Sequence, residues 1–111
     1  MIQRDLTIIQ GETFLKEVGF KVNDRRYPLT GYTAKSQIRP FIGSPELTEE
    51  FTCTVNEEEG TVRMELNPIQ TNKLKKHIYY YDLLLMKGGT NTYYIGGKIF
   101  VHKHITEPYN E

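Results

Sequence analysis

The stretch that decides the fold is His77-Ile-Tyr-Tyr-Tyr-Asp-Leu-Leu-Leu-Met86, which is followed, beyond a turn at Gly88-Gly-Thr-Asn91, by Thr92-Tyr-Tyr-Ile-Gly-Gly-Lys-Ile-Phe-Val101. Two runs rich in aromatic and aliphatic residues around a short glycine turn are typical of a β-hairpin. A strand with one wet face alternates apolar and polar residues. One parity of the first run contains Tyr79, Tyr81, Leu83 and Leu85. The other is nearly as apolar and contains Ile78, Tyr80, Asp82, Leu84 and Met86. Because a small domain has one core, we expect the second face to need a cover of its own.

Length and composition limit the possible classes of protein. The 111 residues suit a single domain over positions 1–111, with flexible ends at 1–4 and 107–111. The fourteen basic and fourteen acidic side chains cancel, which argues against nucleic acid or an anionic membrane as a partner. The apolar runs are too short to cross a bilayer, and the N-terminus lacks the apolar stretch of a signal peptide. The single cysteine, Cys53, has no internal disulfide partner, which favours folding in a reducing cytoplasm.

Further alternating segments predict short strands along most of the chain. They cover residues 6–10, 13–22, 32–39, 47–55 and 61–66, with 47–55 at an edge of the sheet. In segment 32–39 the residues expected to face inward are Tyr32, Ala34, Ser36 and Ile38. About seven short strands at this spacing predict an antiparallel β-sandwich. Gly96 and Gly97, inside a predicted strand, indicate a bulge or a close backbone approach.

Only segment 67–74 suggests a helix, as a short connection between strands. Asn67 can cap its N-terminus, and Pro68 suits the first helical position. Ile69 and Leu74 are expected to point inward.

No pattern in the sequence predicts catalysis, a cofactor or a metal site. His102 and His104 share a strand face but lack the further ligands of a stable metal site. Glu57, Glu58 and Glu59 are consecutive and lack the spacing of a calcium loop, so a solvated turn is the better interpretation. Cys53 has no neighbouring histidine and is interpreted as a structural thiol. The basic cluster of Lys73, Lys75, Lys76 and His77 suits the C-terminal end of the predicted helix.

Two features of the first hairpin strand have architectural interpretations. Asp82 stands in an apolar strand, where we expect a cross-strand ion pair with Lys98 or a hydrogen bond to a partner. Tyr79 or Tyr81 could act as the corner tyrosine of an immunoglobulin sandwich, with its hydroxyl bonded to the preceding connection.

Several segments resemble, in order, the small Ig-like domains of tailed-bacteriophage structural proteins. The segment Leu29-Thr-Gly-Tyr-Thr-Ala-Lys-Ser-Gln-Ile-Arg39 is similar to one common in that family. The other similar segments are Gln10-Gly-Glu-Thr-Phe14, Gly60-Thr-Val-Arg-Met-Glu-Leu66, Gln70-Thr-Asn-Lys-Leu74, Tyr80-Tyr-Asp-Leu-Leu84, and Gly97 to Val101 with Ile105-Thr106. The resemblance spans roughly residues 6–106 and departs from the family pattern at Phe100, His102 and His104. It implies an all-β, Ig-like antiparallel β-sandwich of about seven strands. It also implies a non-enzymatic virion component of the baseplate, fibre anchor, neck or collar, assembled in the host cytoplasm.

The leading functional hypothesis is assembly through the second face of the hairpin. Its predicted interface residues are Ile78, Tyr80, Leu84, Met86, Tyr94 and Phe100. Such a patch exceeds what solitary proteins usually expose, so we expect a homo-oligomer, a ring or trimer, that also binds other phage structural proteins. Loops 42–46 and 56–60 are expected to make secondary contacts. A cover from the chain's own residues is the alternative.

The second hypothesis is a carbohydrate-binding β-sandwich that adheres to a host-surface glycan. In it, Tyr80, Tyr93 and Tyr94 would form the stacking platform for the sugar. An inactive accessory domain of a longer enzyme is a third possibility. A fold alone does not decide among these functions.

Overall fold

The computed structural model describes residues 1–106, apart from the side chain of Val22. Its elements, in chain order, are β1 (Ile2–Gln3), β2 (Leu6–Ile9), β3 (Phe14–Gly19), β4 (Lys21–Val22), β5 (Arg25–Arg26), β6 (Thr33–Arg39), β7 (Glu49–Asn56), β8 (Thr61–Leu66), α1 (Pro68–Asn72), β9 (Ile78–Lys87) and β10 (Thr90–His102). The mostly-β fold with one short helical connection is confirmed.

The hairpin of β9 and β10 is confirmed and is longer than predicted. Pairing continues to Lys87 and Thr90, so the turn consists of Gly88 and Gly89 alone. Both glycines have positive φ angles, 54° and 82°, as a tight two-residue hairpin turn requires. The register shifts between Tyr93 and Ile95, where β10 contains a β-bulge.

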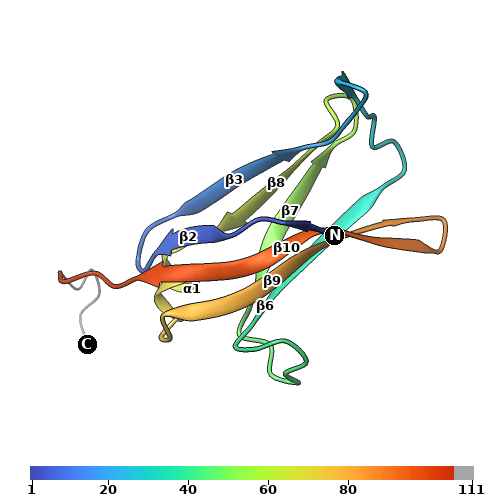
Figure 1. Ribbon diagram of the computed structural model, residues 1–111. Helices are drawn as coiled ribbons and strands as arrows, with labels where there is room; N and C mark the ends of the chain where they lie inside the picture. The colour runs from blue at the N-terminus through green and yellow to red at the C-terminus, as the bar shows by residue number, and fades with distance from the viewer. Residues whose placement is uncertain (107–111) are drawn as a thin grey trace.

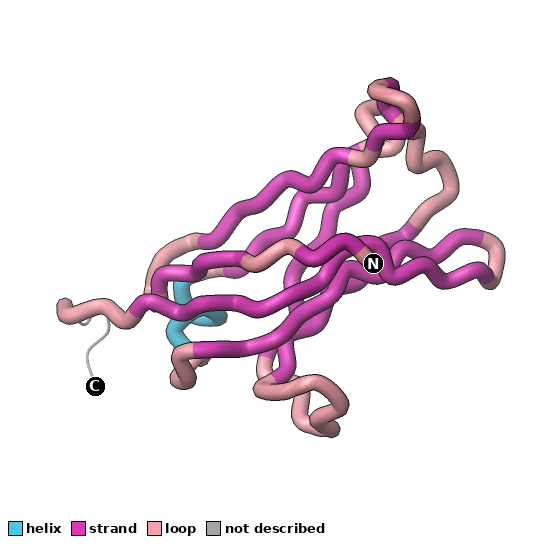
Figure 2. The backbone as a smooth tube through the Cα atoms, viewed as in Figure 1, coloured by secondary structure: helices cyan, strands magenta, loops and turns pink. Residues whose placement is uncertain are grey.

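Eight strands form one curled sheet in the order β1-β10-β9-β6-β7-β8-β3, with β2 beside β10 on the same edge as β1 (Figures 1 and 2). Strand β7 connects the two sides of the curled sheet by hydrogen bonds. Its residues 49–51 pair with β6, and its residues 52–56 pair with β8. The predicted sandwich of two separate sheets is therefore replaced by a half-barrel. The predicted edge position of segment 47–55 was also wrong, because β7 lies between β6 and β8. Strands β1 and β2 run parallel to β10, so the sheet is mixed and not purely antiparallel.

The core fills the inside of this curl. The alternation predicted for the first hairpin strand is confirmed, since its inward side chains are all buried. So is the alternation of β6, where Ser36 and Ile38 are buried. The buried apolar residues are Leu6, Ile8, Phe20, Leu29, Ile38, Phe51, Val62, Met64, Leu66, Leu74, Tyr79, Tyr81, Leu83, Leu85, Ile95, Ile99 and Val101.

Helix α1 closes one end of the curl and has the predicted cap. Asn67 accepts a hydrogen bond from the Gln70 backbone, and the Gln70 side chain accepts one from the Asn67 backbone in return. Leu74 is buried as predicted, but Ile69 is 60% exposed, so its predicted inward position was wrong. The inward position of this single turn belongs to Thr71, whose hydroxyl donates to the Glu12 carbonyl at 2.8 Å.

The N-terminal segment lies along β10 and explains the two strand glycines. The Arg4 amide donates to the Gly96 carbonyl at 2.8 Å, and the Lys98 amide donates to the Asp5 carboxylate at 2.9 Å. A Cβ atom on Gly97 would lie 2.7 Å from the Arg4 carbonyl oxygen, so the predicted close backbone approach is confirmed. The predicted flexible end at 1–4 thus includes β1, which pairs with β10. The other predicted flexible end, 107–111, lies outside the described residues.

Candidate functional site

The candidate site is the outer face of the sheet, opposite the core. Strand β6 contributes Thr33, Lys35, Gln37 and Arg39 to this face, which pair with Met86, Leu84, Asp82 and Tyr80 of β9. Strand β10 lies on the other side of β9. The outer face therefore joins a polar row of side chains to a largely apolar one.

Five of the six predicted interface residues lie on this outer face. Ile78 pairs with Phe100, and each side chain is 38% exposed. Tyr80, Leu84 and Met86 are half-buried.

Tyr94, the sixth predicted interface residue, turns toward the core. Its ring packs on Phe20 with a centroid distance of 4.3 Å. The β-bulge causes this change, because one extra residue in β10 reverses the parity of the strand. Tyr93 takes the outward position instead, pairs with Leu84 and is 52% exposed. In the sequence, the glycine pair at 96–97 indicates that the strand is irregular. It does not indicate on which side of the pair the alternation of inward and outward side chains reverses.

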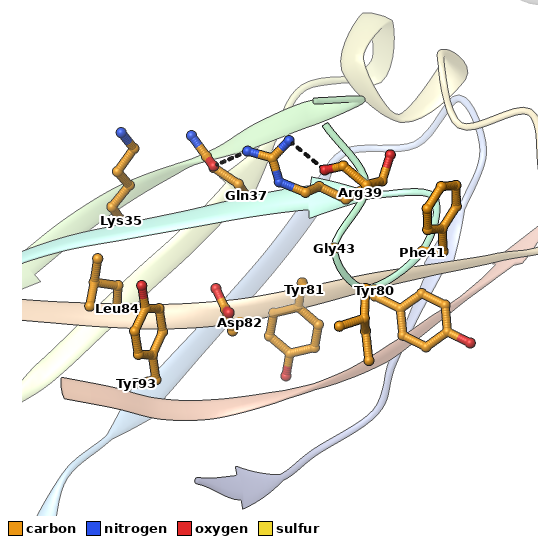
Figure 3. A pocket seen from close by; sticks show the side chains of 12 residues that line it. Lys35, Gln37, Arg39, Phe41, Gly43, Tyr80, Tyr81, Asp82, Leu84 and Tyr93 are labelled. Atoms are coloured by element: carbon orange, nitrogen blue, oxygen red, sulfur yellow. Dashed lines mark hydrogen bonds between the residues drawn. The ribbon is translucent and has the colours of Figure 1, made fainter. Parts of the chain in front are cut away.

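The outer face has two distinct parts. At the α1 end, Ile78 of β9, Phe100 of β10 and Ile9 of β2 are exposed on three adjacent strands. We call these three side chains the apolar strip. Toward the middle of the face lies a groove of about 390 Å³, lined by β6, β9, Tyr93 of β10 and the loop 41–44 (Figure 3).

Arg39 is held in a fixed position at the groove. Its guanidinium donates to the Gln37 side-chain oxygen at 2.9 Å and to the Ser44 carbonyl at 3.2 Å (Figure 3). The loop that supplies Ser44 is closed by a bond from the Ser44 amide to the Phe41 carbonyl at 3.1 Å. This loop leaves Ile42 highly exposed beside the groove.

Asp82 lies in the same groove. The ion pair predicted between Asp82 and Lys98 was wrong. The cross-strand neighbours of Asp82 are Gln37 and Gly96, whereas Lys98 pairs with Tyr80. Burial raises the pKa of the Asp82 carboxyl, and the nearby Arg39 guanidinium partly opposes that rise. The carboxylate makes no hydrogen bond to any residue that the structure describes.

Both candidate corner tyrosines have bonded hydroxyls. The Lys76 amide donates to the Tyr79 hydroxyl at 3.0 Å, which is the bond expected of a corner tyrosine. The Tyr81 hydroxyl donates to the Arg4 carbonyl at 2.6 Å and so fixes the N-terminal segment. Burial raises the pKa of Tyr81 to about 12.

The other sequence candidates do not assemble into a chemical site. His104 lies 3.0 Å from the Asn72 side-chain oxygen, whereas His102 is exposed. Residues 1–106 contain no group of three potential metal ligands. Burial raises the pKa of Cys53 to about 11, which keeps it as a thiol at neutral pH.

The acidic turn and the basic cluster make local contacts. Glu57 accepts from the Gly31 amide at 2.8 Å, and Glu59 pairs with Arg26 at 2.6 Å. Lys73 lies 3.7 Å from Glu49, and the Lys76 ammonium donates to a backbone carbonyl. Within the described part of the chain, no helix has the length and apolar character needed to span a membrane.

No protein-family model matches this chain, and no curated protein is detectably similar to it in sequence.

Proposed function

We propose that this chain is a non-enzymatic structural module of a tailed-bacteriophage virion, located in the tail, baseplate or neck. In this role it self-associates and docks a neighbouring virion protein through the outer face of its sheet. Support comes from the ordered resemblance over roughly residues 6–106. Assembly of the particle would take place in the host cytoplasm.

The strand pairing also supports our proposal that this module is an Ig-like domain. An immunoglobulin sandwich places its third, sixth and seventh strands in one sheet and its first, second, fifth and fourth in the other. The first strand departs from this pattern in this chain, because β2 pairs with β10. Here β6, β9 and β10 are neighbours, and β3, β8 and the second half of β7 are neighbours. The Tyr79 hydroxyl bond lies at the start of β9, where the corner tyrosine of such a domain belongs. In this proposal β7 serves both layers and joins them into the observed curl.

The apolar strip is the observation that carries the assembly role. Ile9, Ile78 and Phe100 are 43%, 38% and 38% exposed on adjacent strands of the outer face. Covering a large apolar side chain completely contributes roughly 1.5–3 kcal/mol. The half-buried Tyr80, Leu84 and Met86 continue this surface along β9. Exposed apolar side chains on neighbouring strands suit a protein contact.

Self-association would follow from the same surface. Identical subunits with one adhesive patch usually close by symmetry, which favours a ring or a trimer. Because association itself costs several kcal/mol, the strip needs the adjoining β9 residues, or a neighbouring virion protein, to form a stable contact.

Light scattering of the purified chain tests the assembly role. We expect an oligomer whose mass falls to that of one chain in Ile78→Glu and Phe100→Glu, because each change places a charge in the apolar contact. Leu15→Glu is the matched control, since Leu15 is 57% exposed on β3, at the opposite edge of the sheet from the apolar strip. A wild-type monomer at high concentration would contradict self-association, and equal effects of all three changes would contradict the role of the apolar strip.

Immunogold electron microscopy tests the virion assignment. Antibodies against the chain should label the tail or neck of particles released by cells that carry its coding sequence. Unlabelled particles that also lack its peptides in mass spectrometry would overturn the assignment.

Carbohydrate binding in host-surface adhesion is the second candidate function. It is favoured by one observation: Tyr80 and Tyr93, two of the three predicted platform tyrosines, line the same groove as Asp82 and Arg39.

A further inference from the structure

We propose that the groove between Tyr80 and Tyr93 binds a neutral saccharide, with Asp82 accepting hydrogen bonds from its hydroxyls and Arg39 donating to them. This inference rests on the second candidate function. Because Tyr80 and Leu84 belong both to the groove and to the surface proposed for assembly, the two roles are tested with separate variants. The sequence predicted a platform of three tyrosines, whereas the proposed site contains two tyrosines and the polar groups of Asp82 and Arg39.

The shape of the groove suits a small ligand. Its volume of about 390 Å³ falls within the range of roughly 300–1,000 Å³ that is typical of small-molecule sites. Tyr80 and Leu84 lie four residues apart on β9, and Tyr93 is the cross-strand neighbour of Leu84. At about 3.3 Å per residue, this spacing separates the two aromatic positions by roughly 13 Å along the strand. Asp82 lies between them (Figure 3). Such a span accommodates a short oligosaccharide rather than a single sugar ring.

The polar groups offer both kinds of hydrogen bond within the same groove. An arginine side chain has five N–H donors, and Arg39 uses two of its donor nitrogens in bonds to Gln37 and Ser44. Its side chain is therefore oriented before a ligand arrives. The Asp82 carboxylate has acceptor capacity that no described residue uses. Sugar hydroxyls donate and accept, so one ligand can satisfy both groups.

The charges argue against the other ligand classes. An anionic ligand would meet the Asp82 carboxylate, and a cationic ligand would meet Arg39 and Lys35 on the opposite wall. An apolar peptide segment would bury Asp82 without a hydrogen-bond partner, which is costly. A neutral polyhydroxylated ligand avoids all three penalties. Its apolar ring faces can also pack on Tyr80 and Tyr93.

The position of Asp82 supports a binding role rather than a structural one. The other outward residues of β9 are apolar or aromatic, and burial already raises the pKa of this carboxyl. A charged group that lies in a cleft without a structural partner is a functional-site candidate.

The test is a titration of the isotopically labelled chain, followed by two-dimensional NMR. The neutral probes are oligomers of glucose, galactose and N-acetylglucosamine, and the charged probes are an oligouronate and an oligolysine. We expect at least one neutral probe to bind, with shifts confined to the groove residues. Tyr93→Ala and Asp82→Asn should each weaken that binding by about tenfold or more, through loss of a stacking surface and of a charged acceptor.

The strip variant Phe100→Glu is the control that separates this site from the assembly role. It should lose self-association and keep saccharide binding, because Phe100 does not line the groove. The proposal is overturned if no neutral probe binds at millimolar concentration. It is also overturned if a charged probe binds more tightly, or if both groove variants bind as the wild type does. None of these results bears on the light-scattering test of the proposed assembly role.

Discussion

The two faces of β9 have similar residues and different surroundings. The inward residues Tyr79, Tyr81, Leu83 and Leu85 are at most 5% exposed. The outward residues of the same strand, Ile78 to Met86, are half-buried or exposed. The sheet curls toward one side only, so β3 and β8 lie across the core from β9, and no element among residues 1–106 covers the outer face (Figure 1). Apolar content therefore does not decide burial here; the direction of curl does.

The tyrosines of β9 show the same difference at the level of single atoms. The hydroxyls of Tyr79 and Tyr81 bond to backbone groups of distant or preceding segments. The hydroxyl of Tyr80 has no protein partner among residues 1–106. The hydroxyls of the inner tyrosines therefore stabilise the fold, and the hydroxyl of Tyr80 is available to bond to a ligand or a partner.

Truncation of two adjacent leucines tests this comparison with the largest expected effect. Leu83 is fully buried, so Leu83→Ala should lower the free energy of unfolding by about 2–5 kcal/mol. Leu84→Ala removes the same atoms from a half-buried position, and we expect a loss of about 1 kcal/mol or less. Urea unfolding followed by circular dichroism measures both values. Equal losses in samples shown to be monomeric would mean that the chain covers its outer face as fully as its inner one.

Removal of single hydroxyls tests the comparison with an intermediate effect. Tyr81→Phe deletes the donor to the Arg4 carbonyl, and we expect a loss of about 1 kcal/mol. Tyr80→Phe is the matched control, for which we expect almost no change. Hydrogen exchange adds a local measurement, because the Arg4 amide bonded to Gly96 should exchange faster in Tyr81→Phe alone. Identical behaviour of the two variants would remove the assigned role of the Tyr81 hydroxyl.

The features that the sequence predicts correctly depend on local chemistry. The alternation of β6 and β9, the cap at Asn67 and the glycine turn of the hairpin each depend on residues close together in the chain. The close approach at Gly97 was also predictable, because a glycine inside a strand has few other uses. The identity of the approaching segment, residues 3–5, was not, since a long-range contact leaves no periodic signal.

The errors come from features that depend on distant partners. Tyr94 changes faces because a bulge breaks the parity of β10, and the sequence does not fix the side on which the parity changes. Asp82 faces Gln37 because of the register between β9 and β6, which the hairpin alone does not determine. The groove itself needs the loop after β6 to fold back beside β9. Periodicity predicted the two faces of the hairpin strand and could not predict what would lie above them.

The pH dependence of stability at Asp82 also tests the comparison between the two faces of β9, and here we expect the smallest effect. Burial raises the pKa of this carboxyl, so the native state binds the proton more tightly than the unfolded state, whose aspartate pKa is about 3.9. Stability should therefore fall as the pH rises from about 4 through the raised native pKa. Asp82→Asn removes this contribution, so its advantage over the wild type should be largest at neutral pH and shrink as the pH falls toward 4. The carboxyl is partly solvated, and we expect a change below about 1 kcal/mol in urea unfolding series. If the advantage of the variant instead grows as the pH falls, the Arg39 guanidinium outweighs burial. Asp82 would then be a paired structural charge and not the free acceptor that the groove requires.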